Sequence, residues 1–279
     1  MENIRDLVSK GVEIEFGMFS PKILADKYEV YGHRWYYERD TDYLNPRPSV
    51  TTILNAQAPA LSFKTWLRHN ETWYTDEFSQ YTREVGNYAH ALCMHLNYGL
   101  EVEFNQSFIE RSLPTKEDPN GEIPLSNEPI PLDDKMVIDI KKCINNYIKW
   151  VSSEKPQILA SELTLYAPAL SWAGQADLVC VIDGELWLID IKTGSPRKRH
   201  RHQVTLYKKL FEYIYQVEID HIGCLHINSK RKSAKLEEYQ YGPVEADHIY
   251  GTYVACLNDG DFPSFKKPLN LPNYFKLEK

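Results

Sequence analysis

Two apolar segments, one beginning near Gly174 and the other ending near Gly194, are joined by the dipeptide Asp183-Gly184. Asp-Gly between apolar segments is a strong signal for a two-residue hairpin turn. A turn at these positions sets Ile182 opposite Glu185, and the same register then continues along both strands. The pattern therefore predicts that Asp177 lies directly opposite Asp190.

Both faces of this predicted hairpin are apolar. One face carries Val179 opposite Leu188 and Val181 opposite Leu186, and the other carries Leu178 opposite Ile189 and Cys180 opposite Trp187. A sheet that is covered on both faces belongs to an α/β sandwich, and a charge at the end of such a strand is costly unless it is paired or bound to a metal.

The rest of the pattern predicts helices that cover this sheet and further strands that extend it. Upstream, we expect a strand pair over residues 28–38 with Tyr31-Gly32-His33 as its turn, a Ser-capped apolar stretch at 48–54, and helices at 61–80 and 82–98. Downstream, we expect a helix at 135–153, a strand at 157–167, the hairpin, a helix at 199–216, a strand at 220–228, an edge strand at 236–241 and a closing helix at 244–258. The predicted core order is αβββαβ.

Residues 112–134 interrupt this pattern with five prolines and several acids. We expect an extended surface excursion here, and neither a repeat nor a linker between independent domains.

Composition is consistent with a globular α/β protein. The chain has 279 residues, of which 43% are hydrophobic and 13% aromatic, enough to bury the core of one elaborated domain or of two small ones. No apolar run approaches the ~18 residues of a membrane span, and the N-terminus lacks the pattern of a signal peptide. An intracellular protein is expected. The five cysteines are widely spaced without a Cys-x-x-Cys pair, so we expect reduced, mostly buried thiols.

The net charge of -7 is not evenly distributed. Basic side chains gather at residues 197–202 with Lys208-Lys209, and again at Lys230-Arg231-Lys232 with Lys235, while acids dominate residues 101–134. The basic clusters could follow a phosphate backbone, or they could be solvated surface. The first cluster comes directly after the hairpin, which favours the functional interpretation.

The two aspartates of the hairpin suggest a metal site. Facing residues in a hairpin have Cβ atoms roughly 4.5–5.5 Å apart, where like charges are destabilising unless a cation offsets them. Lys192 shares the face of Asp190 by strand periodicity. Carboxylates suit Mg²⁺ or Mn²⁺, which can polarise a phosphate and activate water, and the lysine can stabilise charge or position the nucleophile. The alternative is an exposed hairpin whose acids only make it soluble.

Four short motifs in this order resemble those of the PD-(D/E)XK nuclease superfamily, in its RecB-like branch. They are Gly86-x-x-x-His90, Gly174-x-x-Asp177, Asp190-Ile191-Lys192 and Gln203-x-x-x-Tyr207. Pro48-Ser49-Val50-Thr51 and Trp66 extend the likeness to phage exonucleases and mitochondrial genome maintenance exonucleases, so that it covers about residues 45–230. The resemblance implies a restriction-endonuclease-like αβββαβ core with a mixed central sheet flanked by helices.

The resemblance also implies roles for individual residues. By resemblance, Mg²⁺ or Mn²⁺ would be bound by His90, Asp177, Asp190 and the Ile191 carbonyl, Lys192 would be catalytic, and Glu162 would be an auxiliary acid. Gln203 and Tyr207 could contact the DNA backbone, brace the site or simply pack, and Arg197, Lys198, Arg199 and Arg201 could contact DNA. Relatives that hold an iron–sulfur cluster have cysteines without a counterpart here, so no cluster is expected.

The resemblance further implies a single elaborated nuclease domain over residues 1–279. Its parts would be an N-terminal strand region (1–60), a helical layer with the His motif (61–110), the surface excursion (111–134) and the nuclease core (135–260). The implied activity is metal-dependent hydrolysis of DNA, most simply by an exonuclease acting on single strands or free ends in recombination, repair or replication.

Several alternatives remain open at this stage. An endonuclease of the same fold and a noncatalytic DNA-binding protein that keeps the fold both fit the sequence. A helicase or a single-strand-binding protein could be a partner, and a phage origin would place the protein in the host cytoplasm. Trp66, Trp73, Tyr74 and Tyr88 could stack on unpaired bases or belong to the core.

Overall fold

The central feature of the fold is a five-stranded mixed sheet with the order β4-β5-β6-β7-β8. The computed structural model describes residues 1–30, 33–39, 41, 46–57, 72–112 and 132–259. The strands are β4 (Gln157–Leu165), β5 (Gly174–Ile182), β6 (Glu185–Lys192), β7 (His221–His226) and β8 (Lys235–Tyr239). All neighbours are antiparallel except β6 and β7, which are parallel.

The β5–β6 hairpin has the predicted register. Its pairs run from Ile182–Glu185 to Leu178–Ile189. Asp183 and Gly184 have φ values of 53° and 81°, which are the positive values that a two-residue hairpin turn of this kind requires. The continuous pairing ends one step before Asp177 and Asp190, so the expected facing pair lies just beyond the regular ladder.

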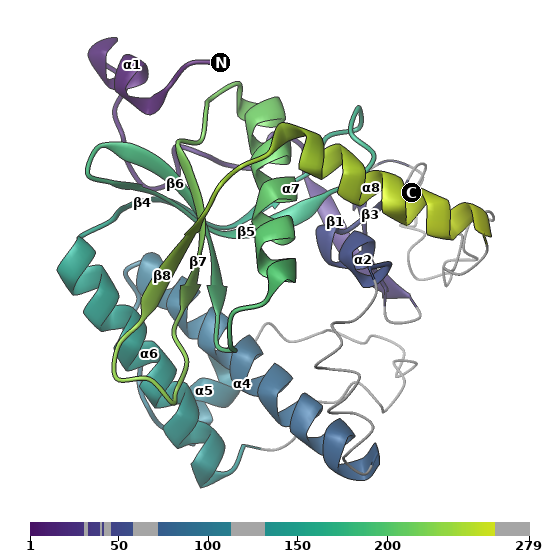
Figure 1. The fold of residues 1–279 in the computed structure, drawn as a ribbon. Helices are drawn as coiled ribbons and strands as arrows, with labels where there is room; N and C mark the ends of the chain where they lie inside the picture. The colour runs from purple at the N-terminus through teal and green to yellow at the C-terminus, as the bar shows by residue number, and fades with distance from the viewer. Residues whose placement is uncertain (31–32, 40, 42–45, 58–71, 113–131, 260–279) are drawn as a thin grey trace, which may run out of the picture.

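Two layers of helices cover the sheet (Figure 1). On one face lie α4 (Thr72–Asn97), α5 (Gln106–Ser112) and α6 (Asp134–Glu154). On the other face lie α2 (Val50–Asn55), α7 (Lys198–Tyr215) and α8 (Pro243–Asp259). Alternate side chains of the hairpin belong to two separate hydrophobic cores. Leu178 and Ile189 pack with α4 and α6, and Val179 and Leu188 pack with α7. The predicted sheet with two apolar faces is confirmed.

The order α6-β4-β5-β6-α7-β7 is the αβββαβ core expected from the sequence. Asp133 caps α6 by accepting a hydrogen bond from the Met136 N–H at 2.7 Å, and α6 ends at Lys155 in the left-handed conformation. The helix α7 forms the crossover between the parallel strands β6 and β7, as such a connection requires.

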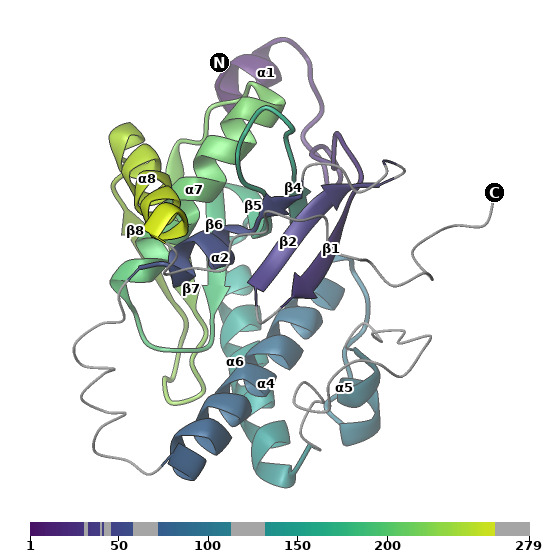
Figure 2. The same cartoon turned by 90° about the vertical axis from the view of Figure 1, so that its right-hand side faces the viewer.

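A second, smaller sheet precedes the core. It consists of β1 (Ala25–Val30), β2 (His33–Glu38) and β3 (Arg47–Pro48) in the order β1-β2-β3 (Figure 2). The predicted strand pair is confirmed, although residues 31 and 32 of its turn lie outside the described ranges. Ser49 caps α2 as expected, and its bridge to Ala173 joins this region to the core sheet.

One helix prediction is wrong. The sequence suggested separate helices at 61–80 and 82–98, but α4 is continuous from Thr72 to Asn97. The polar run near residue 81 contains no glycine or proline, and Thr82 donates its hydroxyl hydrogen bond to the Phe78 carbonyl within the same helix. Polar residues here mark the exposed side of a long helix and not its end. Residues 61–71 lie outside the described ranges.

Three short elements were not anticipated: α1 (Ile4–Ser9), β3 and α5. Most of the predicted surface excursion, residues 113–131, lies outside the described ranges. All five cysteines are free thiols, and four of them are buried, as expected. None of the helices in the described ranges is both long enough and apolar enough to cross a lipid bilayer.

Candidate active site

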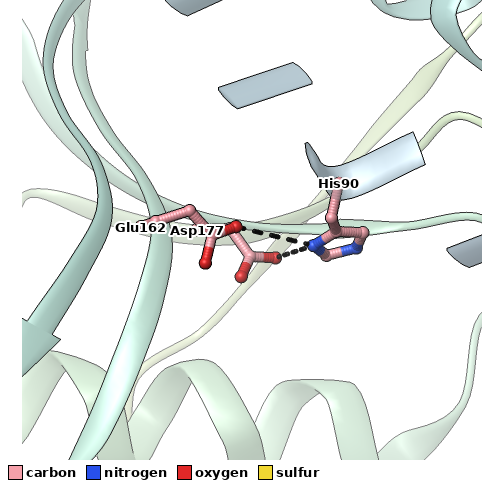
Figure 3. Close-up of side chains that lie close together, drawn as sticks. All are labelled: His90, Glu162 and Asp177. Carbon is pink, nitrogen blue, oxygen red and sulfur yellow. Dashed lines mark ion pairs between the residues drawn. The ribbon is translucent and has the colours of Figure 1, made fainter. Parts of the chain in front are cut away.

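Three side chains from three elements converge at the open end of the β5–β6 hairpin (Figure 3). His90 lies on α4, Glu162 on β4 and Asp177 on β5, and one ligand atom of each lies within 4.8 Å of the others. The His90 Nδ1 atom is 3.5 Å from Asp177 Oδ2 and 3.9 Å from Glu162 Oε1. The side chains of His90 and Glu162 are 26% and 24% exposed, so solvent reaches the cluster.

The backbone at Glu162 departs from regular strand geometry. Its φ is 52°, a left-handed value that is uncommon for a residue with a side chain, and the regular pairing with β5 omits Glu162 and Asp177. Gln175 Nε2 donates a hydrogen bond to the Glu162 carbonyl at 3.2 Å, and Lys27 Nζ donates to Gln175 Oε1 at 3.2 Å. This irregularity brings the Glu162 carboxylate to the side of Asp177 and His90.

The helix α4 lies against β4 and places His90 beside the strands. A Cβ atom on Gly86, one turn before His90, would lie 3.4 Å from Thr193 Oγ1, which is an ordinary contact. Burial acts to lower the pKa of His90, but the carboxylates of Asp177 and Glu162 outweigh it and raise the pKa to about 9. The imidazole is therefore protonated at neutral pH when no metal is bound.

Asp177 is held from two directions. Its Oδ2 atom accepts a hydrogen bond from the Ile191 N–H at 2.7 Å, and its main-chain carbonyl accepts one from Ser161 Oγ at 3.3 Å. Burial raises the pKa of Asp177, and the charge of His90 opposes this shift. The Ile191 N–H thus orients the Asp177 carboxylate, and the Ile191 carbonyl stays a predicted metal ligand.

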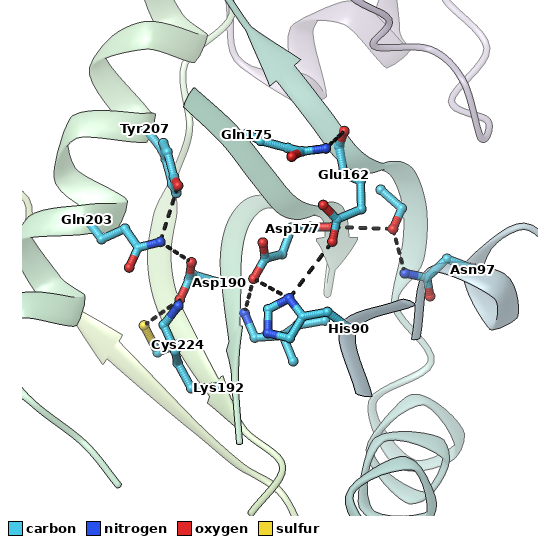
Figure 4. A network of polar contacts seen from close by, with 12 residues as sticks. His90, Asn97, Glu162, Gln175, Asp177, Asp190, Lys192, Gln203, Tyr207 and Cys224 are labelled. Carbon is cyan, nitrogen blue, oxygen red and sulfur yellow. Dashed lines mark hydrogen bonds and ion pairs between the residues drawn. The ribbon is translucent and has the colours of Figure 1, made fainter. Parts of the chain in front are cut away.

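Asp190 has a different set of partners (Figure 4). Its side chain is fully buried and forms an ion pair of 2.5 Å with Lys192 Nζ. It also accepts hydrogen bonds from Gln203 Nε2 at 2.7 Å and from the Cys224 thiol at 3.8 Å. Among the described residues, the two aspartates thus face different groups: Asp177 faces His90, and Asp190 faces Lys192.

Burial and charge act in opposite directions on this ion pair. Burial raises the pKa of Asp190 to about 6, and the ammonium group of Lys192 limits the shift. For Lys192, burial acts to lower the pKa, but Asp190 and Asp177 outweigh it and raise the pKa above its ordinary value. The Lys192 side chain is 22% exposed, so its ammonium group can donate hydrogen bonds to a ligand from the same position.

The Gln203-x-x-x-Tyr207 motif lies directly behind Asp190. Gln203 and Tyr207 are both buried, and Gln203 Nε2 contacts the Tyr207 hydroxyl at 3.2 Å as well as Asp190. A Cβ atom on Gly174 would lie 2.5 Å from Tyr207 Cε1, so only glycine fits beside this ring. This geometry favours the bracing role for the motif over contact with DNA.

The basic residues at the start of α7 divide into two groups. Arg199 donates hydrogen bonds to the Thr51 carbonyl and to Asn55, and Arg201 forms an ion pair of 2.8 Å with Glu245. Residues 197 and 198 are exposed. Of the four predicted DNA contacts in this segment, Arg199 and Arg201 have intramolecular partners that a DNA strand would have to share or replace.

Residues 197–202 and the triplet Lys230-Arg231-Lys232 lie at the same end of the sheet as Lys192, whereas Lys208 and Lys209 lie farther along α7 and pair with Glu212 and Asp247. Lys192 pairs with His226 in the parallel β6–β7 ladder, so both strands end at this edge. The segment of residues 197–202 begins just after β6, and Lys230-Arg231-Lys232 forms the exposed turn between β7 and β8. The predicted metal site and these two basic segments therefore share one end of the sheet.

The aromatic residues proposed for base stacking are only partly described. The side chains of Trp66, Trp73 and Tyr74 lie outside the described residues, and Tyr88 is 4% exposed within the core. Tyr88 therefore has the packing role.

Sequence reasoning did not single out the residues that support the site, which include Asn97, Tyr147, Ser161, Gln175 and Cys224. Only the spacing of Asn97, two turns after His90, and the position of Ser161, next to Glu162, could have indicated them. Their partners are distant in sequence and became visible only in the structure.

The residues of the cluster fit a divalent cation. Two carboxylates and an imidazole are a donor set that suits Mn²⁺, and carboxylates are the usual protein ligands of Mg²⁺. The close approach of Glu162 and Asp177 in a largely buried setting is unfavourable without a cation, and in the metal-free protein the protonated His90 supplies that charge.

No protein-family model and no curated protein sequence matches this chain. Among solved structures, an alkaline exonuclease (LHK-Exo) from Laribacter hongkongensis is similar over 77% of this chain and 88% of its own, with 9% identity and a TM-score of 0.37. SSO0001 is similar over 66% of this chain and 77% of its own, with 14% identity and a TM-score of 0.29. The order α6-β4-β5-β6-α7-β7 and the five-stranded mixed sheet are those that the motif resemblance to the PD-(D/E)XK superfamily implies.

Proposed function

We propose that this protein is a metal-dependent DNA nuclease that hydrolyses phosphodiester bonds. The observation that carries the proposal is the convergence of His90, Glu162 and Asp177 within 4.8 Å, beside the buried ion pair of Asp190 with Lys192. A noncatalytic DNA-binding surface has no need for clustered carboxylates, because they repel phosphate unless a cation lies between them.

The three converging side chains would hold Mg²⁺ or Mn²⁺. When bound, such an ion polarises a phosphodiester and lowers the pKa of water, so that hydroxide is available at neutral pH. By the motif resemblance Asp190 would also be a ligand, and in the metal-free protein Gln203 and Lys192 hold its carboxylate.

Lys192 has two tasks in this scheme. In the metal-free protein its ammonium group neutralises the buried Asp190. In the complex with DNA it would donate hydrogen bonds to the scissile phosphate and stabilise the negative charge that develops there. In the metal-free protein, burial acts to lower the pKa of Lys192, but Asp190 and Asp177 raise it above its ordinary value, which favours the ammonium form.

The substrate would approach the end of the sheet at which β6 and β7 terminate. Exposed basic side chains at residues 197–198 and 230–232 could contact the phosphates on either side of the cleavage point. We propose single strands or free ends as the preferred substrate, and thus an exonuclease, on the basis of the motif resemblance. A helicase or a single-strand-binding protein would be a natural supplier of such strands.

The test is degradation of single-stranded DNA labelled at the 5′ or 3′ end, with Mg²⁺, Mn²⁺ or EDTA, by the native chain and by Lys192→Ala. A covalently closed single-stranded circle is included as a second substrate. We expect metal-dependent shortening that slows by about 10²–10³-fold in Lys192→Ala, and an exonuclease spares the circle.

The other outcomes separate the alternatives. Cutting of the circle would identify an endonuclease of the same fold. Binding of DNA without cleavage under every metal condition would refute the proposal and leave a noncatalytic DNA-binding protein. Cleavage that continues undiminished in Lys192→Ala would remove the lysine from the catalytic role.

A further inference from the structure

A chain of three polar side chains runs from the helical layer to the backbone of Asp177, and Figure 4 shows its part between Asn97 and Asp177. The Tyr147 hydroxyl donates to Asn97 Oδ1 at 2.5 Å, Asn97 Nδ2 donates to Ser161 Oγ at 2.9 Å, and Ser161 Oγ donates to the Asp177 carbonyl at 3.3 Å. Each group donates in the same direction. Hydrogen bonds arranged in this way strengthen one another.

The chain joins the elements that carry the three converging side chains. Asn97 ends α4, and it lies two helical turns after His90, on the same face of the helix. Ser161 precedes Glu162 on β4, and Asp177 accepts the last hydrogen bond. A shift of α4 against the sheet would therefore break this chain at the same time as it moved His90.

The surroundings of the chain are apolar. Tyr147 and Ser161 are 1% and 7% exposed, and Cys93, Cys143 and Cys180 belong to the same buried core. Apolar side chains of similar size would fill this space without the cost of removing polar groups from water. The polar chain thus provides directional contacts at a place where packing alone would not require them.

We propose that Tyr147, Asn97 and Ser161 are positioning residues that set the distance between His90 and the carboxylates of Glu162 and Asp177. The inference rests on the proposed metal site. Groups that orient metal ligands from behind typically change metal affinity by about 10–100-fold when they are removed.

The experiment is titration of the metal-free full chain with Mn²⁺, in which free Mn²⁺ is followed by electron paramagnetic resonance. Tyr147→Phe and Ser161→Ala should each weaken Mn²⁺ binding by about tenfold. Because the three groups act as one chain, the effects of the two substitutions should not add. The Mn²⁺ affinity of the double variant should be nearly the same as that of the single variant that binds more weakly.

A matched control is Tyr81→Phe. The Tyr81 hydroxyl donates to Asp139 Oδ2 at 2.9 Å and also joins α4 to α6, but it has no part in the chain to Asp177. It should leave the affinity for Mn²⁺ unchanged. Thermal unfolding in EDTA is measured for each variant, because a merely structural role would lower the unfolding temperature of all of them and leave the affinity of the folded protein intact.

His90→Ala tests the metal site separately from the positioning role. Native affinity in His90→Ala would refute the metal site itself, and the inference with it. Lost binding in His90→Ala together with native affinity in both Tyr147→Phe and Ser161→Ala would refute the positioning role and leave the proposed function standing. If Ser161→Ala does not fold, the isosteric Tyr147→Phe decides the question alone.

Discussion

Binding of a metal at this site should release a proton from His90. The pKa of His90 in the metal-free protein is about 9, because Asp177 and Glu162 flank the ring. A metal needs the neutral imidazole, and pH 7 lies about two units below the pKa of His90, so metal binding must displace a bound proton. This costs about 3 kcal/mol, or roughly a hundredfold in affinity.

The assay is calorimetric titration with Mn²⁺ at pH 7 in two buffers that differ in ionisation enthalpy. The difference in observed heat gives the number of protons released, and we expect about one for each Mn²⁺. Between pH 7 and 8 the affinity should rise about tenfold. His90→Ala, which lacks the titrating ring, should bind more weakly and release close to none.

The sign of the effect on stability is also fixed. A raised histidine pKa stabilises the fold fully below the unfolded-state pKa of about 6.5, and this stabilisation is lost as the pH rises through the folded-state value. In EDTA, the free energy of unfolding of the native chain should therefore fall by up to about 3 kcal/mol between pH 6.5 and 9, relative to that of His90→Ala. Native protein that releases no proton on binding Mn²⁺, or parallel stability curves for the two proteins, would refute this account of His90.

Three further predictions concern single positions. Lys192→Ala should reduce the cleavage rate constant by about 10²–10³-fold under saturating DNA, as expected when a donor to a developing charge is lost, while circular dichroism shows an intact fold. Gly174→Ala should destabilise the protein by about 1–3 kcal/mol in urea unfolding, because its Cβ would overlap the Tyr207 ring at 2.5 Å, whereas Gly86→Ala should be neutral or slightly stabilising; equal effects would contradict the packing argument. Glu162→Gly should relieve the left-handed backbone and stabilise the metal-free protein by about 1 kcal/mol while it weakens Mn²⁺ binding, and a loss of stability in EDTA would show that the carboxylate contacts outweigh the strain.

The sequence predicted the hairpin correctly because all the information is local. An Asp-Gly turn sets the register, and alternation of side chains then determines which residue faces which core. The same reasoning could not see that pairing stops at Leu178–Ile189. Beyond that pair the Ile191 N–H donates to the Asp177 side chain. On the other side of β5, the β4 residue Glu162 has a left-handed backbone whose carbonyl accepts a hydrogen bond from Gln175.

Most of the features that the sequence did not predict depend on contacts between residues that are distant in sequence. His90 and Gln203 were singled out by motif, but the structure was needed to show that the first faces Asp177 and the second faces Asp190. The continuity of α4 was missed because a polar stretch on a long amphipathic helix looks like a boundary when its neighbours are unknown.

The division of the site between α4 and the sheet has a consequence for how activity appears during synthesis and folding. A nascent chain that has completed α4 carries His90 but neither carboxylate, and an isolated sheet carries Glu162 and Asp177 without the imidazole. Neither fragment has the complete ligand set. Under the proposed function, metal binding and cleavage would therefore begin only once the helical layer has docked on the sheet.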